Sequence, residues 1–232
     1  MSDDAPAPAA FRHQAETYDP PPEGVWAPVH IDEHLIVVDK PAGLLTVPGR
    51  GQHLQDCLIH RVQRHCPDAL IVHRLDMATS GLVVLGRGPV AQRLLSALFQ
   101  ARQVDKAYEA LVDGLVAQDA GDIDLPLITD WPRRPLQKVD HEIGKPSQTR
   151  YVVRARDATA GRTRLHLEPL TGRSHQLRVH CLAIGHPILG DPLYGPTRTQ
   201  QAAARLCLHA SALAFTHPVT GEALTWRSPV PF

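Results

Sequence analysis

The sequence predicts an α+β protein built on a mixed, mainly antiparallel central sheet with flanking helices. Many short β-branched segments lie between turns rich in glycine and proline, and they do not alternate regularly with helices as in a βαβ protein. The chain has 232 residues, of which 43% are hydrophobic and 21% charged, so it can bury a large core. We find no internal repeat.

Residues 1–27 are expected to form a flexible, acidic and proline-rich tail. They contain three consecutive prolines, Pro20 to Pro22, and show no apolar periodicity. A secretory signal would be basic and then apolar, and no run of about 18 apolar residues occurs in the chain. We therefore expect a soluble, cytoplasmic protein whose folded domain covers residues 28–232.

The folded part is expected to begin with a strand and a helix. Residues 35–39 form a β-branched run that stops at a turn over residues 40–43, and residues 44–49 continue the strand briefly. Apolar residues at helical spacing then predict a helix over residues 54–65.

A loop over residues 73–81 follows, between strands at residues 71–72 and 82–85. An exposed loop between two strands is where a rigid sheet presents a reactive side chain. Pro89 begins a second helix whose apolar face includes Leu95.

The second half of the chain is expected to be dominated by strands. Residues 122–147 appear as an irregular, proline-rich segment. Ser174 is expected to cap the N-terminus of a helix that Gly185 ends. The predicted elements are strands at residues 106–116, 150–156, 162–168, 207–215 and 223–227 and a helix at residues 175–184.

Charge is distributed unevenly along the chain. The formal net charge is zero and the sequence pI is about 7.3, although a protein that binds RNA is expected to be basic. Residues 1–40 carry two basic and eight acidic side chains, whereas residues 133–178 carry eleven basic and four acidic ones. The basic stretch is consistent with a local surface that binds a polyanion such as RNA. The alternative is a charged face that is only solvated.

Three side chains at or beside turns are candidates for chemistry: Asp76, Tyr108 and Arg178. A carboxylate in a pocket needs a nearby cation to stay ionised, and Arg178 or Arg74 could supply it. A tyrosine offers a flat face on which a base can stack and a phenol that can relay a proton. The structural alternatives are a turn aspartate, a half-buried strand tyrosine and a surface arginine.

Residues 73–85, with the sequence HRLDMATSGLVVL, resemble the signature of the RluA family of pseudouridine synthases. Four further segments agree with the family in the expected order: residues 39–49, 106–108, 172–180 and 185–191. The resemblance covers roughly residues 30–232. It implies the pseudouridine synthase fold, with a catalytic cleft across the sheet, and an isomerase that acts on RNA.

The resemblance assigns roles to the same three residues. It implies that Asp76 is the catalytic carboxylate, that Tyr108 stacks against the target uracil and that Arg178 pairs with Asp76. The reaction detaches uracil from ribose at N1, rotates it and rejoins it through C5, so we expect neither a cofactor nor a metal. Asp76 could attack C1′ of the ribose, add to C6 of the base or remove a 2′-proton, and the sequence leaves these three routes open.

Further residues are expected to bind the RNA. Arg74 is placed to touch a phosphate or to occupy the gap left by the extruded nucleotide. The other expected contacts are His73, Thr79, Arg133, Arg134, Lys138, Arg173 and Leu177.

Residues 124–138 and 144–149 resemble the dual-specificity branch of the family, which modifies both a 23S rRNA loop and a tRNA anticodon stem-loop. We expect no N-terminal S4-like RNA-binding domain, which agrees with this branch. We therefore expect a monomer whose partners are these two structured RNAs, with no membrane association. The alternatives are a family member with a single rRNA or tRNA target and an inactive RNA-binding or chaperone module.

Two other readings receive less support from the residues. Cys57, His60, His65 and Cys66 have the composition of a zinc site, but their spacing is wrong for paired ligands and reduced thiols are expected. A glycosidase-like hydrolase would need a second carboxylate near Asp76, and the motif contains none.

Overall fold

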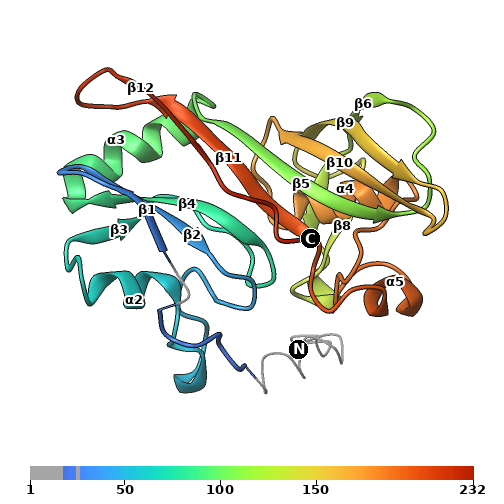
Figure 1. The fold of residues 1–232 in the computed structure, drawn as a ribbon, viewed down its shortest axis with the longest axis horizontal. Coiled ribbons are helices and arrows are strands. Elements are labelled where there is room, and N and C mark those ends of the chain that lie inside the picture. The colour runs from blue at the N-terminus through green and yellow to red at the C-terminus, as the bar shows by residue number, and fades with distance from the viewer. Residues whose placement is uncertain (1–17, 25–26) are drawn as a thin grey trace. The chain divides into compact units, whose positions relative to one another are not determined.

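The computed structural model describes residues 18–24 and 27–232, which form two units (Figure 1). The unit that we call the Asp76 unit contains the described residues of 18–107 together with 209–232. The Arg178 unit contains residues 108–208. The chain passes from one unit to the other within β5 (Asp105–Asp113) and returns within β11 (Leu208–Thr216).

A mixed sheet forms the core of the Asp76 unit. Its strands besides β11 are β1 (Ala27–Ile31), β2 (Leu35–Lys40), β3 (Ala69–Ile71), β4 (Ser80–Arg87) and β12 (Ala223–Arg227). The order is β1-β2-β4-β11, with β3 also paired to β4 and β12 to β11. β4 and β11 run parallel and the other pairs are antiparallel, which confirms the predicted mixed, mainly antiparallel sheet.

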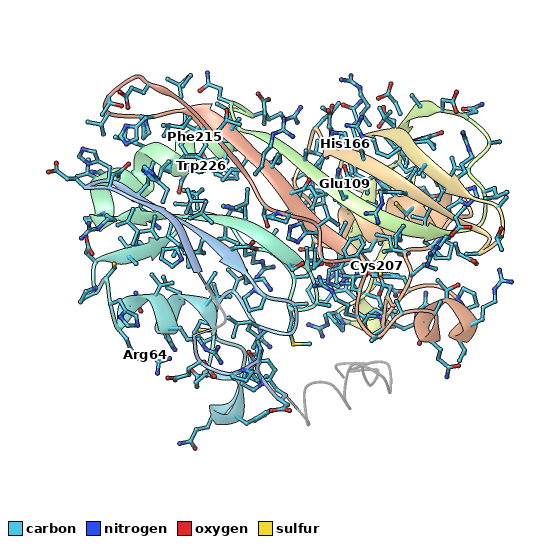
Figure 2. The ribbon with its side chains drawn as sticks, in the orientation of Figure 1. Arg64, Glu109, His166, Cys207, Phe215 and Trp226 are labelled. Carbon is cyan, nitrogen blue, oxygen red and sulfur yellow. The ribbon has the colours of Figure 1, made fainter. Side chains whose placement is uncertain are left out.

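Helix α3 (Gly88–Gln100) supplies part of the hydrophobic core of this unit. Leu95 packs in one cluster with strand residues such as Leu82 and Val84, because alternate side chains of β4 point to the same face. The labelled Phe215 and Trp226 in Figure 2 belong to paired strands, and their ring centroids are 5.4 Å apart. The helix that was predicted to begin at Pro89 is present and begins one residue earlier, at Gly88.

The Arg178 unit is built on antiparallel strands. β5 is followed in the sheet by β10 (Arg162–Pro169), β9 (Gln148–Asp157) and β6 (Ala120–Asp124). On β5 and β10, the labelled Glu109 and His166 in Figure 2 face each other in register, with Oε1 and Nδ1 3.0 Å apart. The unit also holds the helices α4 (Gln176–Ala183) and α5 (Thr197–Gln201).

The stretch over residues 122–147 is more regular than its composition predicts. Besides the end of β6, it contains β7 (Leu127–Thr129), a 3-10 turn η2 (Trp131–Arg133) and β8 (Gln137–Val139). β7 and β8 pair as a separate two-stranded sheet. We refer to residues 127–139 as the β7–β8 hairpin.

Two helix predictions need correction. The expected helix over residues 54–65 is split into the 3-10 turn η1 (Gln52–Leu54) and α2 (Leu58–Gln63), because the backbone of Cys57 is extended. Ser174 does not cap α4: the capping position is His175, in the left-handed conformation with φ 53° and without a side-chain cap. Both differences concern backbone angles that apolar spacing does not report.

Most of the expected tail over residues 1–27 lies outside the described residues. Of those described, Tyr18 donates a hydrogen bond to the carbonyl of Asp56, and the carbonyls of Pro21 and Pro22 accept bonds from Arg61. None of the helices in the described part of the chain has the length and apolar character that a membrane span requires.

Candidate functional site

The loop that carries Asp76 connects β3 to β4 and is held through its backbone. Lys40, at the end of β2, is fully buried, and its Nζ donates to the carbonyl of Met77 at 3.2 Å. The same carbonyl accepts the backbone N–H of Gly43 at 2.9 Å. Because Met77 directly follows Asp76, these bonds fix the loop on its C-terminal side.

Thr46 fixes the other side of the loop. Its buried hydroxyl donates to the carbonyl of Leu75 at 2.7 Å and accepts the N–H of Leu75 at 3.3 Å. The N–H of Thr79 then closes a turn on the carbonyl of Asp76 at 3.1 Å. Asp76 itself is half-buried, and all of these loop bonds use backbone groups rather than its carboxylate.

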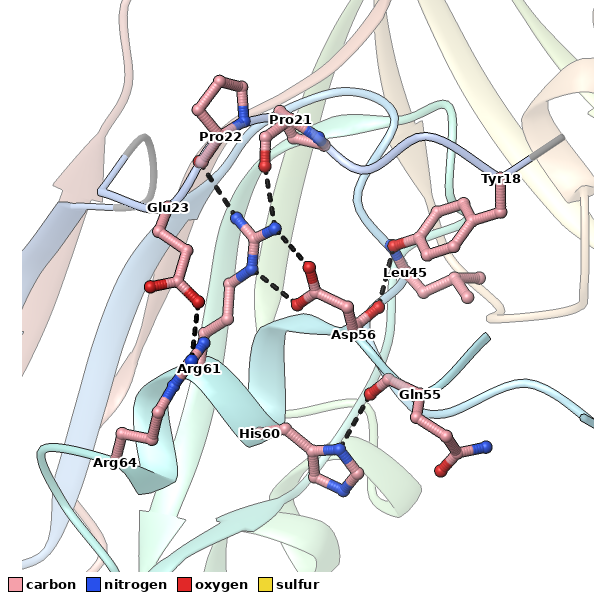
Figure 3. Close-up of polar contacts among 10 residues, drawn as sticks. All are labelled: Tyr18, Pro21, Pro22, Glu23, Leu45, Gln55, Asp56, His60, Arg61 and Arg64. Carbon is pink, nitrogen blue, oxygen red and sulfur yellow. Dashed lines mark hydrogen bonds and ion pairs between the residues drawn. The ribbon is translucent and has the colours of Figure 1, made fainter. Parts of the chain in front are cut away.

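The segment that contains Thr46 is anchored in turn to the N-terminal strap, residues 18–24 (Figure 3). The N–H of Leu45 donates to the Tyr18 hydroxyl at 3.0 Å, and this hydroxyl donates to the carbonyl of Asp56 at 2.8 Å. Tyr18 therefore connects the strap to Leu45 and to Asp56, which lies just before α2.

Arg61 on α2 closes the same network from a fully buried position. Its guanidinium makes a bidentate pair with Asp56, with both N–O distances 2.7 Å, and donates to the carbonyls of Pro21 and Pro22. The Arg61 bond lowers the pKa of the Asp56 carboxyl and raises the pKa of the guanidinium, so both groups stay charged.

His73 occupies a structural position. Its Nε2 accepts the N–H of Val84 at 3.0 Å, and its ring stacks on Phe99 with centroids 4.4 Å apart. Burial, with a smaller contribution from the Lys106 charge, lowers the pKa of His73 to about 3. The imidazole is therefore a neutral acceptor near pH 7, and its predicted contact with RNA stays a prediction.

Arg178 lies on α4 and is held by its own side chain. It is 3% exposed, and its Nε and Nη2 donate to the two carboxylate oxygens of Asp191 at 2.8 and 2.7 Å. The guanidinium also lies 5.0 Å from the centroid of the Tyr194 ring. Asp191 in turn accepts the N–H groups of Leu193 and Tyr194, so the carboxylate that orients Arg178 is itself oriented.

The three predicted catalytic residues are divided between the two units. Asp76 belongs to one unit, and Tyr108 and Arg178 belong to the other. Tyr108 is half-buried on β5, where it pairs with Leu167 of β10. The predicted pairing of Asp76 with Arg178, and the cleft across the sheet, stay predictions.

The predicted RNA contacts fall into exposed and buried sets. Arg74 and Arg173 are exposed, as are Arg133, Arg134 and Lys138 on the β7–β8 hairpin, whereas Thr79 and Leu177 are buried, which favours a packing role for these two. Arg134 stacks on Trp131 at 4.4 Å from the ring centroid, and Trp131 is 61% exposed.

Acidic partners offset much of the basic stretch over residues 133–178. Several of these partners lie outside it in sequence, so the stretch is less positive in the fold than in the sequence. The ion pairs are Arg133–Asp130, Lys138–Asp140, Arg150–Asp122, Arg150–Glu168, Arg154–Glu109, Arg156–Asp119 and Arg162–Asp157.

Cys57, His60, His65 and Cys66 do not form a metal-binding cluster. Across residues 18–24 and 27–232, no group of three or more His, Cys, Asp or Glu side chains is placed to hold a metal ion. The free thiol of Cys57 is buried at the start of α2, and burial raises its pKa.

Sequence reasoning missed the residues that support the predicted site. Lys40 and Asp191 lie within segments that resemble the family, but the residues next to them in sequence do not indicate which atoms they bind. A buried charge with a defined partner is a signal that appears only in the fold.

Comparison with known proteins gives a consistent result. A family model described as RNA pseudouridylate synthase matches residues 34–183. The chain is 49% identical over 219 residues to the dual-specificity RNA pseudouridine synthase RluA of Escherichia coli K12, covering 94% of this chain and 99% of that protein. It is 47% identical over 216 residues to the protein of the same name from Pasteurella multocida, covering 93% and 98%.

Solved structures agree with these relatives. Human RNA pseudouridylate synthase domain containing 1 superposes with a TM-score of 0.76 at 30% identity, covering 92% of this chain and 87% of the human one. Human RNA pseudouridylate synthase domain containing 4 gives a TM-score of 0.73 at 24% identity, with 88% of each chain covered, and supports the fold.

Proposed function

Because the chain belongs to the RNA pseudouridylate synthase family and is an isomerase that acts on RNA, we propose that it modifies two kinds of site. These are a uridine in a 23S rRNA loop and a uridine in a tRNA anticodon stem-loop. The relatives that cover nearly the whole chain carry the name dual-specificity RNA pseudouridine synthase, and this observation carries the proposal.

Asp76 is the catalytic carboxylate in this proposal. Its loop is held on both sides by Lys40 and Thr46, which suits a side chain that must keep one position relative to the target nucleoside. The carboxylate acts at C1′, at C6 or on the 2′-proton of the target, and each route ends with uracil joined to ribose through C5.

Arg178 and Tyr108 complete the proposed site. Arg178 pairs with Asp76 while Asp191 holds its Nε and Nη2, since an arginine has five N–H donors and can bind two carboxylates. Tyr108 stacks on the target uracil after the nucleotide leaves its helix, offsetting part of the few kcal/mol that unstacking costs.

The proposed RNA surface comprises Arg74, Arg173 and the basic residues of the β7–β8 hairpin, Arg133, Arg134 and Lys138. These side chains are exposed, and phosphate contacts from arginine and lysine position an RNA without reading its sequence. We propose that the enzyme acts on these substrates in the cytoplasm and as a monomer.

The decisive experiment compares the wild type with Asp76→Asn on two RNAs, an anticodon stem-loop and a 23S rRNA loop fragment. Pseudouridine is mapped by chemical modification and primer extension, and RNA affinity is measured separately. We expect the wild type to modify both RNAs, and Asp76→Asn to bind them with little change in affinity but to form no pseudouridine.

Asp68→Asn is the matched control, because Asp68 is a surface carboxylate of the same unit that pairs with Arg87 at 3.0 Å. It should retain the wild-type rate. Modification by Asp76→Asn at the wild-type rate would remove Asp76 from the chemistry, and modification of one RNA alone by the wild type would replace dual by single specificity.

A further inference from the structure

A chain of four hydrogen-bonded side chains runs through the Asp76 unit at the start of β4. Ser80, the first residue of β4, lies opposite His209 of β11 in the parallel pairing, with Oγ and Nδ1 2.8 Å apart. His209 Nε2 lies 2.9 Å from the Ser228 hydroxyl, which donates to the Asp39 carboxylate on β2. These hydrogen bonds therefore connect β2, β4, β11 and the C-terminal segment.

The chemistry of these groups fixes the direction of each bond. An ionised carboxylate only accepts, so the Ser228 hydroxyl uses its proton on Asp39. The Ser228 oxygen must then accept, which makes His209 Nε2 the N–H donor. When His209 is neutral, its Nδ1 accepts, so Ser80 donates to Nδ1 and every donor points towards Asp39.

Burial makes this arrangement rigid. Ser80, His209 and Ser228 are all buried, where a satisfied polar chain has few alternative arrangements. Gly81 adds a steric constraint: its φ is 112°, and a Cβ there would lie 2.3 Å from the Ala210 carbonyl oxygen. β4 and β11 therefore meet in one register at the residue that follows Ser80.

Both ends of this series of hydrogen-bonded side chains adjoin the loop that carries Asp76. Ser80 follows Thr79, whose N–H closes the turn on the Asp76 carbonyl. Asp39 precedes Lys40, whose Nζ holds the Met77 carbonyl. Successive side chains of a strand point to opposite faces, so Asp39 and Lys40 serve the chain and the loop from one place on β2.

We propose that Asp39, Ser228, His209 and Ser80 are positioning residues that hold the Asp76 loop in its reactive arrangement. The inference rests on the proposed role of Asp76. The four side chains set the rate of isomerisation once RNA is bound, and they do not determine RNA affinity.

Two substitutions of His209 remove different hydrogen bonds of the series. His209→Asn keeps an acceptor near the position of Nδ1 and retains the Ser80 link, whereas His209→Gln keeps a donor near Nε2 and retains the Ser228 link. Because Ser80 is the link to the loop, we expect kcat to fall by roughly 100-fold in His209→Gln and by about 10-fold in His209→Asn, with KM unchanged.

His217→Gln is the control. His217 is also buried in this unit, just beyond the other end of β11, where its Nδ1 accepts the N–H groups of Val219 and Thr220. It should lower Tm comparably while kcat stays within about twofold of the wild type. Ser80→Ala, which removes a single hydroxyl, tests the same link if the His209 variants fail to fold.

Equal losses of kcat in His209→Asn, His209→Gln and the His217 control would overturn the proposal, because a general loss of stability would then explain them. Wild-type kcat in Ser80→Ala would also overturn it. If Asp76→Asn is active, the proposed catalytic role fails instead, so the two failures are distinguishable.

Discussion

The loop that carries Asp76 is fixed through its backbone, whereas Arg178 on α4 is fixed through its own side chain. Lys40 and Thr46 bind carbonyl and N–H groups of the residues on either side of Asp76. Arg178 instead forms a bidentate pair with Asp191, and both members are buried.

This difference predicts that loss of a support residue affects the reaction rate at the Asp76 loop and the free energy of unfolding at Arg178. The bonds from Lys40 and Thr46 set the position of the loop backbone that carries Asp76, so loss of either support residue should first affect the rate. A buried ion pair is costly to break, because removing one partner leaves the other charged without compensation. Loss of the Arg178 support should therefore first affect stability.

The largest expected effect comes from Asp191→Ala. Arg178 then lies buried without its carboxylate, and the free energy of unfolding should fall by about 3–5 kcal/mol. Urea unfolding followed by circular dichroism measures this change. The double variant Arg178→Met, Asp191→Leu should recover much of the stability but no activity, and a double variant as unstable as Asp191→Ala would contradict the ion-pair explanation.

Lys40→Met tests the other side of the comparison. It leaves the carbonyls of Pro41, Leu44 and Met77 without their ammonium donor, which should cost about 2 kcal/mol of stability. We expect kcat to fall by about 10-fold or more in single-turnover kinetics, because the loop loses its C-terminal support. The exposed Lys145→Met is the control and should keep wild-type kcat; a Lys40→Met enzyme with wild-type kcat would remove the distinction.

We expect His73 to make the stability of the Asp76 unit depend on pH. Its pKa is about 3 in the folded protein and about 6.5 in a model peptide, so below pH 6.5 the unfolded chain binds a proton that the folded chain does not. The contribution of His73 to stability should be fully present above pH 6.5 and should fall as pH decreases towards 3, by up to about 1.4 kcal/mol per pH unit. His73→Gln keeps an acceptor for Val84. Urea unfolding between pH 7 and 5 should show that the free energy of unfolding changes less steeply with pH in this variant than in the wild type. Identical slopes would show that His73 does not carry the dependence.

The parts of the fold that were predicted correctly rest on local patterns. The β-branched run at β2, the apolar face of α3 and the turn residues around Asp76 are properties of neighbouring residues, so the sequence displays them. The family resemblance then located the candidate site on those elements.

The supports of the site were not predicted, because each joins residues that are distant in sequence. Lys40 binds a carbonyl 37 residues away, and Arg61 binds the strap 40 residues away. Apolar spacing also predicted too long a helix before residue 65, since it cannot detect the extended backbone of Cys57. Lys40 and Arg61 are buried charges, a class that composition places on the surface.

The smallest effect on stability is expected from Lys138 on the β7–β8 hairpin, because its side chain is exposed. Lys138 is 47% exposed and pairs with Asp140 at 3.0 Å, so Lys138→Ala should change stability by no more than about 0.5 kcal/mol. If Lys138 contacts a phosphate, the slope of log affinity against log salt concentration should decrease by about 0.7–0.9, with kcat unchanged. Fluorescence anisotropy with a labelled anticodon stem-loop measures this slope.

Arg198→Ala, a substitution of another exposed basic residue of the same unit, should leave the slope unchanged. A smaller slope in both variants would indicate general electrostatic attraction, and a change in kcat for Lys138→Ala would place the hairpin among the groups that position the reacting uridine.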